Sequence, residues 1–349
     1  MAADAKSKRF LINTGFGGLS VFLAILFTTV VLVISNADPV EVYKNITIGS
    51  VGSVQKIMLV LSAWVPLLLV SAGLLVTFAA GLWNIGIEGQ IMLGAIFTTW
   101  ALRTLQNTDL APALIIIIGF LAGMLGGALW AALVGLLRIY GGVNEIFGGL
   151  GMNFVSTALS LWLIFGPWKR PGIGSMSGTE QFKNALWLPT FEGYNASPWS
   201  LGIAILSIIV IGIILGNTYF GLRLKAVGKN LRAAFLLGIP TARYMISAFL
   251  ICGALAGLAG AVQVMAVFHR LIPSISSGYG FLGLLVVMLV NYSPIWVPVI
   301  TLVFAALNIG SIQLPIVLRL DSALAGVLQG SLVLFVLLMD GVRRRLTRQ

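Results

Sequence analysis

Long apolar runs separated by short polar segments make up most of the chain. Ten of them approach the ~20 residues that a transmembrane helix needs, at about residues 19–34, 56–80, 85–105, 111–137, 144–166, 199–216, 243–268, 280–292, 294–310 and 323–340. Runs 280–292 and 294–310 are short, and Asn291-Tyr292-Ser293-Pro294 between them also fits one broken helix. The pattern predicts an all-α polytopic membrane protein of about ten transmembrane helices, forming a single transmembrane domain over residues 1–349.

Composition supports this class and excludes others. Hydrophobic residues make up 59% of the 349 residues and charged residues only 9%, whereas soluble proteins carry about 25% charged residues. A net charge of +11 is also typical of proteins that bind nucleic acid, but the basic residues follow the predicted topology, so we expect no nucleic-acid partner. A lone Cys252 and a lone His269 exclude an internal disulfide and a histidine-cluster metal site, and no cofactor is predicted.

The distribution of charge predicts the orientation in the membrane. With the N-terminus inside the cell, most of the 21 basic residues fall in cytoplasmic segments, as the positive-inside rule requires. Ten spans then place both termini on the cytoplasmic side of a prokaryotic cell membrane. Run 19–34 fits either a first helix or a signal peptide, since Ser35-Asn36-Ala37 loosely matches a cleavage site; we favour the uncleaved helix.

Two loops are long in this topology. Segment 167–198 lies outside and is rich in proline and tryptophan, which fits either a cap at the membrane interface or a surface for a partner protein. Segment 217–242 lies inside and carries an amphipathic helical pattern through Leu231, Ala234 and Phe235. It either lies on the anionic inner leaflet or docks into another protein, and its small residues favour docking.

Stripes of small residues predict where helices pack closely. Gly119, Gly123 and Gly127 recur at four-residue spacing in one run, and Gly253 and Gly257 do so in another. Small residues at this spacing let helix backbones approach one another within a membrane bundle. We read both stripes as scaffold.

A polar, glycine-rich stretch at residues 81–90 interrupts the apolar pattern. It holds Asn84, Glu88 and Gln90 between two long apolar runs. A charged side chain at the bilayer centre costs roughly 3 kcal/mol or more, so Glu88 needs an interface, a wet cavity or a protein partner. We predict that this stretch braces or lines a path through the membrane.

A second polar group opens the run at 144–166. It comprises Asn144, Glu145 and Asn153. Glu145 and Asn153 are eight residues apart, about 80° around a helix, so they can share one interior face. For Glu145 the alternative is a carboxylate at a helix start, where the helix dipole favours negative charge.

An internal repeat is suggested by a third stretch. Ser276-Ser277-Gly278-Tyr279-Gly280-Phe281-Leu282-Gly283 precedes the eighth run much as residues 81–90 precede the third. In the predicted topology the two stretches start on opposite sides of the membrane. This arrangement is typical of inverted repeats, which place the substrate path between broken helices.

Three motifs in this order resemble the permease subunits of ABC importers in the branched-chain amino acid and simple-sugar superfamily. They are Asn84-Ile85-Gly86-Ile87-Glu88-Gly89-Gln90, then Val143-Asn144-Glu145-Ile146 with Met152-Asn153, then Gly228-Lys229-Asn230 with Ala233-Ala234 and Gly238-Ile239. The first motif is most similar to the nucleoside-uptake branch. The resemblance covers about residues 55–340.

The resemblance implies a division of labour. An external binding lipoprotein or periplasmic protein would deliver substrate, two permease subunits would form the path, and cytoplasmic ATPases would bind ATP and drive transport. The second permease would be a paralogue, giving a heterodimer, and this chain itself would not be an enzyme. The residues matched to the ATPase-coupling loop are Gly228, Lys229, Asn230, Ala233, Ala234, Gly238 and Ile239, and those matched to the pathway are Asn84, Glu88, Gln90, Asn144, Glu145 and Asn153.

The sequence is also compatible with two other functions. An ABC permease for simple sugars or other small solutes fits the same motifs. An ion-coupled secondary transporter would use intramembrane carboxylates such as Glu88 and Glu145. A membrane-embedded enzyme is disfavoured because no set of nucleophile and base appears within the runs.

Overall fold

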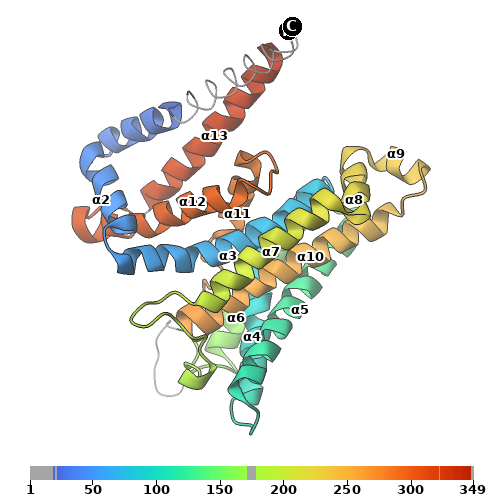
Figure 1. Ribbon diagram of the computed structural model, residues 1–349, viewed down its shortest axis with the longest axis horizontal. Helices are drawn as coiled ribbons and strands as arrows, with labels where there is room; N and C mark the ends of the chain where they lie inside the picture. The colour runs from blue at the N-terminus through green and yellow to red at the C-terminus, as the bar shows by residue number, and fades with distance from the viewer. Residues whose placement is uncertain (1–18, 20–21, 171–177, 322, 347–349) are drawn as a thin grey trace. The chain divides into compact units, whose positions relative to one another are not determined.

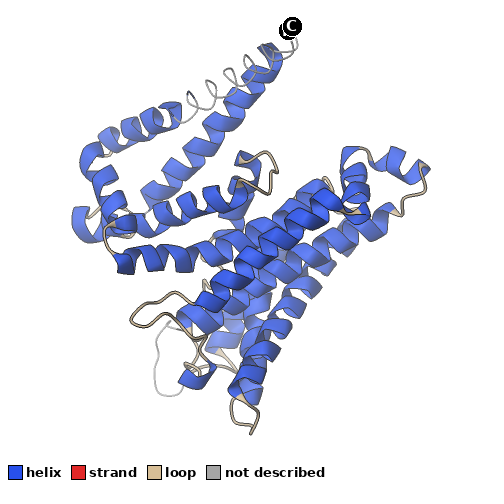
Figure 2. Ribbon diagram, viewed as in Figure 1, coloured by secondary structure: helices blue, strands red, loops and turns tan. Residues whose placement is uncertain are grey.

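The structure is a computed structural model that describes residues 19, 22–170, 178–321 and 323–346. Within these ranges every regular element is a helix (Figure 2), which confirms the predicted all-α class. The basic residues that precede the first run, and residues 171–177 of the loop expected outside, lie beyond the described ranges. The chain divides into two compact units, Leu61–Leu302 and a second formed by Met1–Val60 with Val303–Gln349; each is described by itself.

The unit Leu61–Leu302 contains the helices that carry the candidate site (Figure 1). Its elements are most of α3 (Val54–Ala79), then α4 (Ile87–Leu105), α5 (Pro112–Ile139), α6 (Glu145–Phe165), η1 (Asn184–Leu186), α7 (Pro198–Asn217), α8 (Tyr219–Lys229), α9 (Leu231–Leu236), α10 (Thr241–Val262), η2 (Gln263–Phe268), α11 (Tyr279–Leu289) and the start of α12 (Val297–Ser311). Helices α4, α5 and α10 pack against one another at its centre.

The other unit combines the two ends of the chain. It contains a helix over Phe22–Ile34, α2 (Pro39–Val51), the end of α12, η3 (Leu314–Leu318) and α13 (Ala323–Leu346). Leu32, Val42 and Leu314 belong to its buried core. The Thr28 and Ser331 hydroxyl oxygens lie 3.0 Å apart and join the two chain ends by a hydrogen bond.

The predicted count of about ten spans is not supported. Six helices in the described ranges are long and apolar enough to cross a membrane, namely Val54–Ala79, Pro112–Ile139, Glu145–Phe165, Pro198–Asn217, Thr241–Phe268 and Val297–Leu318. A seventh is reached only if Phe22–Ile34 and Pro39–Val51, which meet at 113°, form one broken span. The chain is still a polytopic helical membrane protein.

The difference in count has identifiable causes. The run at 280–292 forms only the 11-residue α11, about 16 Å long at 1.5 Å per residue, against ~30 Å of hydrocarbon. The run at 85–105 does form the 19-residue α4, but Glu88, Gln90 and Arg103 make it too polar to count among the candidate spans, and 14 of its residues are buried. Apolar runs of this kind record burial within protein as well as contact with lipid.

The glycine stripes pack as predicted. An ideal Cβ built at Gly127 of α5 would overlap backbone atoms of Gly253 and Gly257 on α10, and one built at Gly257 would overlap the Gly123 carbonyl oxygen. Such contact requires residues without side chains on both helices. The prediction that the stripes are scaffold is confirmed, and the close pair α5–α10 supports α4.

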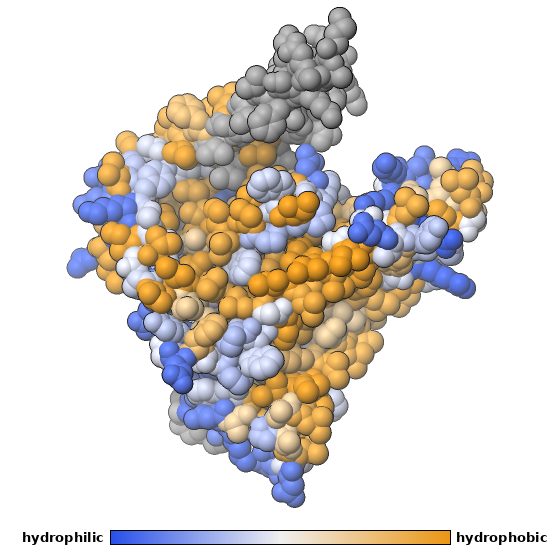
Figure 3. Space-filling view, viewed as in Figure 1, coloured by the Kyte–Doolittle hydropathy of each residue, from blue (hydrophilic) through white to orange (hydrophobic). Residues whose placement is uncertain are grey.

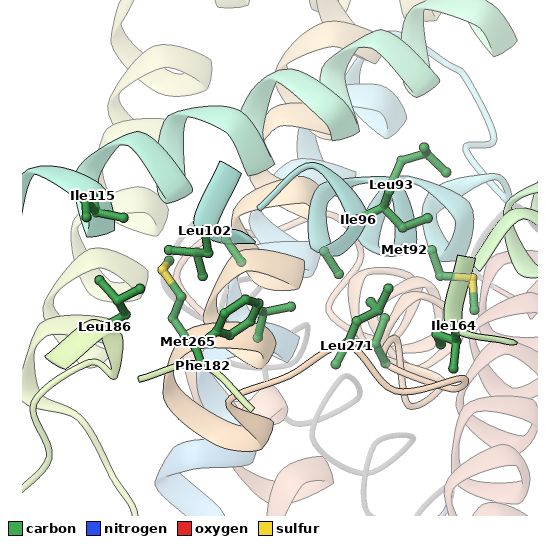
Figure 4. Close-up of a cluster of buried hydrophobic side chains, with 14 residues drawn as sticks. Met92, Leu93, Ile96, Leu102, Ile115, Ile164, Phe182, Leu186, Met265 and Leu271 are labelled. Carbon is green, nitrogen blue, oxygen red and sulfur yellow. The ribbon is translucent and has the colours of Figure 1, made fainter. Parts of the chain in front are cut away.

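The loop between α6 and α7 packs onto the helices beside it. Phe182 and Leu186 belong to the same buried cluster as Leu102 and Met265 (Figure 4). The ring of Trp187 stacks on that of His269, with centroids 3.8 Å apart. Burial lowers the pKa of His269, against a smaller opposing effect of the Met265 carbonyl. These contacts favour the cap among the two readings of this loop.

The surface of the unit Leu61–Leu302 has the pattern expected of a membrane protein. Figure 3 shows an apolar face along its helices, with polar side chains gathered near the α8–α9 end. Many large apolar side chains of α7 are exposed, among them Leu206 and Ile209. Lipid is the solvent that such a face requires.

Candidate functional site

The polar stretch between α3 and α4 forms a tight turn. Gly81 takes φ 72, in the left-handed region that favours glycine. Leu82 N–H then donates to the Thr77 carbonyl, 2.9 Å away, and closes the end of α3. The chain turns back and starts α4 at Ile87, so the polar side chains of this stretch lie at the first turn of a buried helix.

Asn84 and Gln90 are paired with each other. The Asn84 side-chain nitrogen donates to the Gln90 oxygen at 2.9 Å, and the Gln90 nitrogen donates to the Asn84 oxygen at 2.8 Å. Both side chains are fully buried, and the Asn84 nitrogen also lies 3.1 Å from Cys252 Sγ of α10. Each amide satisfies the other, so the pair braces the turn and does not face a path.

The Asn84–Gln90 pair leads to a prediction about stability. Asn84→Leu leaves the buried Gln90 amide without its partner, which should cost about 1–3 kcal/mol of stability. The double variant Asn84→Leu/Gln90→Met removes both polar groups and should recover part of this loss. Thermal unfolding of the purified protein in detergent checks the order: wild type, then the double variant, then Asn84→Leu. A double variant less stable than Asn84→Leu would contradict the brace.

Glu88 links two segments that are distant in the sequence. Its Oε1 accepts hydrogen bonds from the N–H groups of Gly280 at 2.7 Å and Phe281 at 3.1 Å, in the first turn of α11. Ser276 lies in the segment before α11 and lines the same cavity as Glu88. Free N–H groups at a helix start favour an anion. Glu88 therefore holds the starts of α4 and α11 together, and the two stretches that the sequence pattern paired are in contact. The inverted repeat itself stays a prediction.

Asn153 of α6 holds the same turn from the other side. Its side-chain oxygen accepts from Gly89 N–H at 2.8 Å, and its side-chain nitrogen donates to the Ile85 carbonyl at 2.9 Å. One amide thus serves a donor in the first turn of α4 and an acceptor in the turn that precedes it. A side chain added at Gly89 would meet the Asn153 oxygen at 3.0 Å, which explains the glycine beside Glu88.

A cavity of about 400 Å³ lies where these segments meet. Its lining comes from α4, α6, the segment before α11, and α11 itself: Glu88, Met92, Leu150, Asn153, Phe154, Thr157, Pro273, Ser274, Ser276, Ser277, Gly278 and Phe281. Four hydroxyl side chains, an amide and a carboxylate line it beside two phenyl rings. This mixture can bind an uncharged polar solute with a flat face.

Two of the six predicted pathway residues line this cavity. Glu88 and Asn153 do so, and the buried pair Asn84 and Gln90 does not. The serines and phenylalanines were not predicted as site residues. The glycine- and serine-rich pattern of Ser276–Gly283, already unusual before an apolar run, was the signal for Ser276, Ser277 and Phe281. No such signal in the sequence marked Phe154.

Asn144 and Glu145 lie at the start of α6 and not among the lining residues. The Asn144 side chain accepts from Ile146 N–H at 2.9 Å, as an N-cap. Glu145 Oε2 lies 2.9 Å from Arg138 Nε at the end of α5, although the angle is too bent for a regular hydrogen bond. Both residues fix the α5–α6 turn, which agrees with the helix-start alternative.

The motif residues of loop 217–242 form two short helices with a break between them (Figure 1). Asn230 lies between α8 and α9 and caps α9, because its side-chain oxygen accepts from Ala233 N–H at 2.9 Å. Gly238 takes φ 78 and ends α9, and Ile239 N–H donates to the Ala234 carbonyl at 3.1 Å. These residues define the shape of the loop.

The loop presents apolar side chains outward. Phe235, Leu236 and Leu237 are 68%, 77% and 79% exposed, while Ala234 is 2% exposed and packs inside. Consecutive exposed apolar residues beyond the end of the helices are typical of a contact with another protein. Of the two readings of this loop, docking fits the geometry better.

The loop also touches the turn before α4. A Cβ built at Gly228 of α8 would overlap the Ala79 carbonyl oxygen, and one built at Gly81 would lie 3.0 Å from the Gly228 carbonyl oxygen. The two backbones are in direct contact. We expect a displacement of α8 to be passed to this turn, which leads into α4.

Most of the chain matches a family of known proteins. Residues 56–337 match the family described as branched-chain amino acid transport system / permease component. No solved structure matches significantly.

Several curated relatives are named as permeases of ABC transporters. The glucose ABC transporter permease protein TsgB13 of Haloferax volcanii is 29% identical, covering 93% of this chain and 87% of the relative. The nucleoside ABC transporter permease protein NupB of Lactococcus lactis subsp. cremoris is 28% identical, covering 84% and 82%. The guanosine ABC transporter permease protein NupP of Bacillus subtilis is 22% identical, covering 91% of each. The chain is therefore a member of the branched-chain amino acid transport system / permease component family, the sugar- and nucleoside-type ABC permeases.

Proposed function

We propose that this chain is one of two permease subunits of an ATP-driven importer whose substrate is a nucleoside. The observation that carries the proposal is the cavity between α4, α6 and α11, where hydroxyl and amide groups lie beside Phe154 and Phe281. Ribose hydroxyls suit the polar groups, and a flat base suits the exposed phenyl faces. Relatives named for nucleoside and guanosine transport support it.

A sugar is the second candidate substrate. The relative TsgB13 is named as a glucose permease, and the same serines and Asn153 could hydrogen-bond a sugar. The phenyl rings of Phe154 and Phe281 favour a nucleoside over a sugar, because a flat aromatic base can stack on a phenyl ring in an offset arrangement and a sugar has no aromatic ring. We place nucleosides first for this reason.

An ATP-driven importer of this type also needs other subunits. An ATPase docks on α9, a second, paralogous permease completes the path, and an external binding protein delivers substrate. ATP hydrolysis biases the permease only if the ATPase holds loop 217–242 differently in the inward- and outward-open states. Contact between Gly228 and Gly81 provides the route from that loop to the cavity.

Uptake measurements test the substrate. The chain is expressed with its neighbouring transporter genes in cells that lack their own nucleoside uptake, and labelled nucleoside and labelled glucose are offered in turn. We expect nucleoside uptake that depends on the ATPase subunit and persists when the proton gradient is collapsed. Uptake of glucose alone would overturn the nucleoside assignment, and uptake without the ATPase subunit would overturn the coupling.

A variant within the cavity tests its role. Thr157→Leu should reduce nucleoside uptake about tenfold, since a larger apolar side chain replaces a lining hydroxyl and about 1.4 kcal/mol corresponds to tenfold. Ala158→Leu is the matched control, because Ala158 is the next residue of α6, exposed and outside the lining. Equal uptake by the two variants would show that the cavity is not on the path.

A further inference from the structure

A second cavity, of about 740 Å³, lies at the α7–α8 end of the unit Leu61–Leu302. Its walls come from the end of α3, the last turns of α7, α8 and the segment after α11. The lining residues are Leu75, Phe78, Ala79, Gly212, Leu215, Gly216, Leu222, Lys225, Ala226, Gly228, Lys229, Tyr292, Pro294 and Ile295. Its volume is in the ~300–1,000 Å³ range of small-molecule sites. The proposed substrate path does not pass through it, although Gly228 and Lys229 of its wall also belong to the predicted coupling motif.

The cavity has an apolar part along α7. Gly212 and Gly216 are one turn apart on this helix; a Cβ at Gly216 would meet no atom within 4 Å, and one at Gly212 would meet only Pro294 at 3.8 Å. The two glycines leave a shallow groove, walled by Leu215 and Ile295. Helix α7 is one of the six candidate spans, and Gly212 lies about 7.5 Å before its end at 1.5 Å per residue. If α7 spans the membrane, Gly212 lies at the depth of lipid acyl chains and Gly216, one residue before the end of the helix, lies at the edge of the hydrocarbon.

The other part of the cavity is cationic. Lys225 and Lys229 are four residues apart on α8, so they share one helix face, and both line the cavity. No aspartate or glutamate is in the lining, and neither lysine has an ion pair within the described ranges. A ligand with negative charge at one end complements these two ammonium groups.

Aromatic side chains lie at the cavity, with Phe78 and Tyr292 in its lining. Phe78 packs against Trp83 and Tyr292, with ring centroids 5.4 Å and 5.1 Å apart. Tyr292 is held at φ 63, in a region that bulky residues seldom adopt. Tryptophan and tyrosine gather where hydrocarbon meets the headgroups. The lysines then lie at headgroup level and the glycine groove lies below it.

We infer that this cavity binds one anionic phospholipid, with an acyl chain along Gly212 and Gly216 and the phosphate between Lys225 and Lys229. The predicted orientation puts this end in the cytoplasmic leaflet, where anionic lipids and basic helix ends attract each other. A soluble partner reaches the lysines but not a groove at acyl depth. The inference does not depend on which solute is transported. Because α8 also contacts the turn before α4, the bound lipid steadies the helix that leads to α9.

Native mass spectrometry of the full-length chain, purified with its partner subunits, tests the site. Phosphatidylglycerol and phosphatidylcholine with the same acyl chains are titrated separately. Phosphatidylglycerol should be retained more tightly by wild type. Lys225→Gln should weaken its binding about fivefold, and Lys225→Gln/Lys229→Gln about thirtyfold, from ~1 kcal/mol per basic residue, with phosphatidylcholine unchanged. Gly216→Leu should weaken both lipids, because it fills the groove.

Arg223→Gln is the matched control. Arg223 is an exposed cation on the same helix, lies outside the lining and hydrogen-bonds the Tyr244 hydroxyl at 3.4 Å. The inference fails if Arg223→Gln and Lys225→Gln weaken phosphatidylglycerol equally, or if wild type does not distinguish the two lipids. It also fails if inorganic phosphate displaces the lipid, which indicates a phosphate site, or if only the isolated chain binds, which indicates that a partner subunit covers the cavity. Size-exclusion chromatography confirms that each variant is folded.

Discussion

Glu88→Ala is expected to reduce substrate uptake about tenfold or more, whereas Glu88→Gln should retain most of it. The alanine removes the oxygen that accepts from Gly280 and Phe281 N–H. Each buried donor left without an acceptor costs about 1–3 kcal/mol, so the starts of α4 and α11 should separate and the cavity lose its shape. Glutamine keeps an oxygen in the same place.

The contrast between the two variants also tests what the carboxylate is for. A proton-coupled mechanism, or a direct charge contact with substrate, needs the titratable group and would fail in Glu88→Gln as fully as in Glu88→Ala. Uptake of labelled substrate in cells, corrected for the amount of protein in the membrane, measures both. Glu180→Ala, on the exposed loop between α6 and α7, is a control that should match wild type. Loss of uptake in Glu88→Gln would exclude a purely positioning role.

Phe235→Ser should disconnect the permease from its ATPase. Phe235 is 68% exposed on α9, and truncation of a central aromatic contact typically costs about 2 kcal/mol or more, which is about thirtyfold in affinity. Substrate-stimulated ATP hydrolysis should fall by a similar factor while the variant stays folded. Pull-down of the ATPase with purified permease and measurement of ATP hydrolysis in liposomes check the result.

Tyr140→Ser is the matched control for the α9 contact. Tyr140 is 71% exposed at the α5–α6 turn, which the predicted topology places on the same side of the membrane as α9. It should retain the ATPase. If both variants lose it equally, the effect is not specific to α9. Ala234→Glu is a poorer test, because Ala234 is buried and a glutamate there would disrupt α9 itself.

The sequence determined the class of protein and the local shape of several elements. Composition and long apolar runs require a helical membrane protein, since lipid leaves backbone groups no partner but their own helix. The glycine stripes specified the α5–α10 contact, because close approach depends only on having no side chain. Asn230 and Gly238 broke and ended the helices of loop 217–242 for equally local reasons. The order of the three motifs indicated the family.

Only the tertiary structure decided what the polar residues do. Glu88 finds its donors at Gly280 and Phe281, 192 and 193 positions away, and no spacing within one helix reveals such a partner. Asn84 and Gln90 are polar residues of the same stretch as Glu88, but they hydrogen-bond each other and line neither of the two cavities described above. The number of spans was overestimated for two reasons. The polar residues of α4 already make it a poor span by composition, whereas the shortness of α11 and the bend before α2 depend on how the chain packs and turns. The sequence showed which polar residues are unusual for an apolar chain, and the contacts between distant segments determined what those residues do.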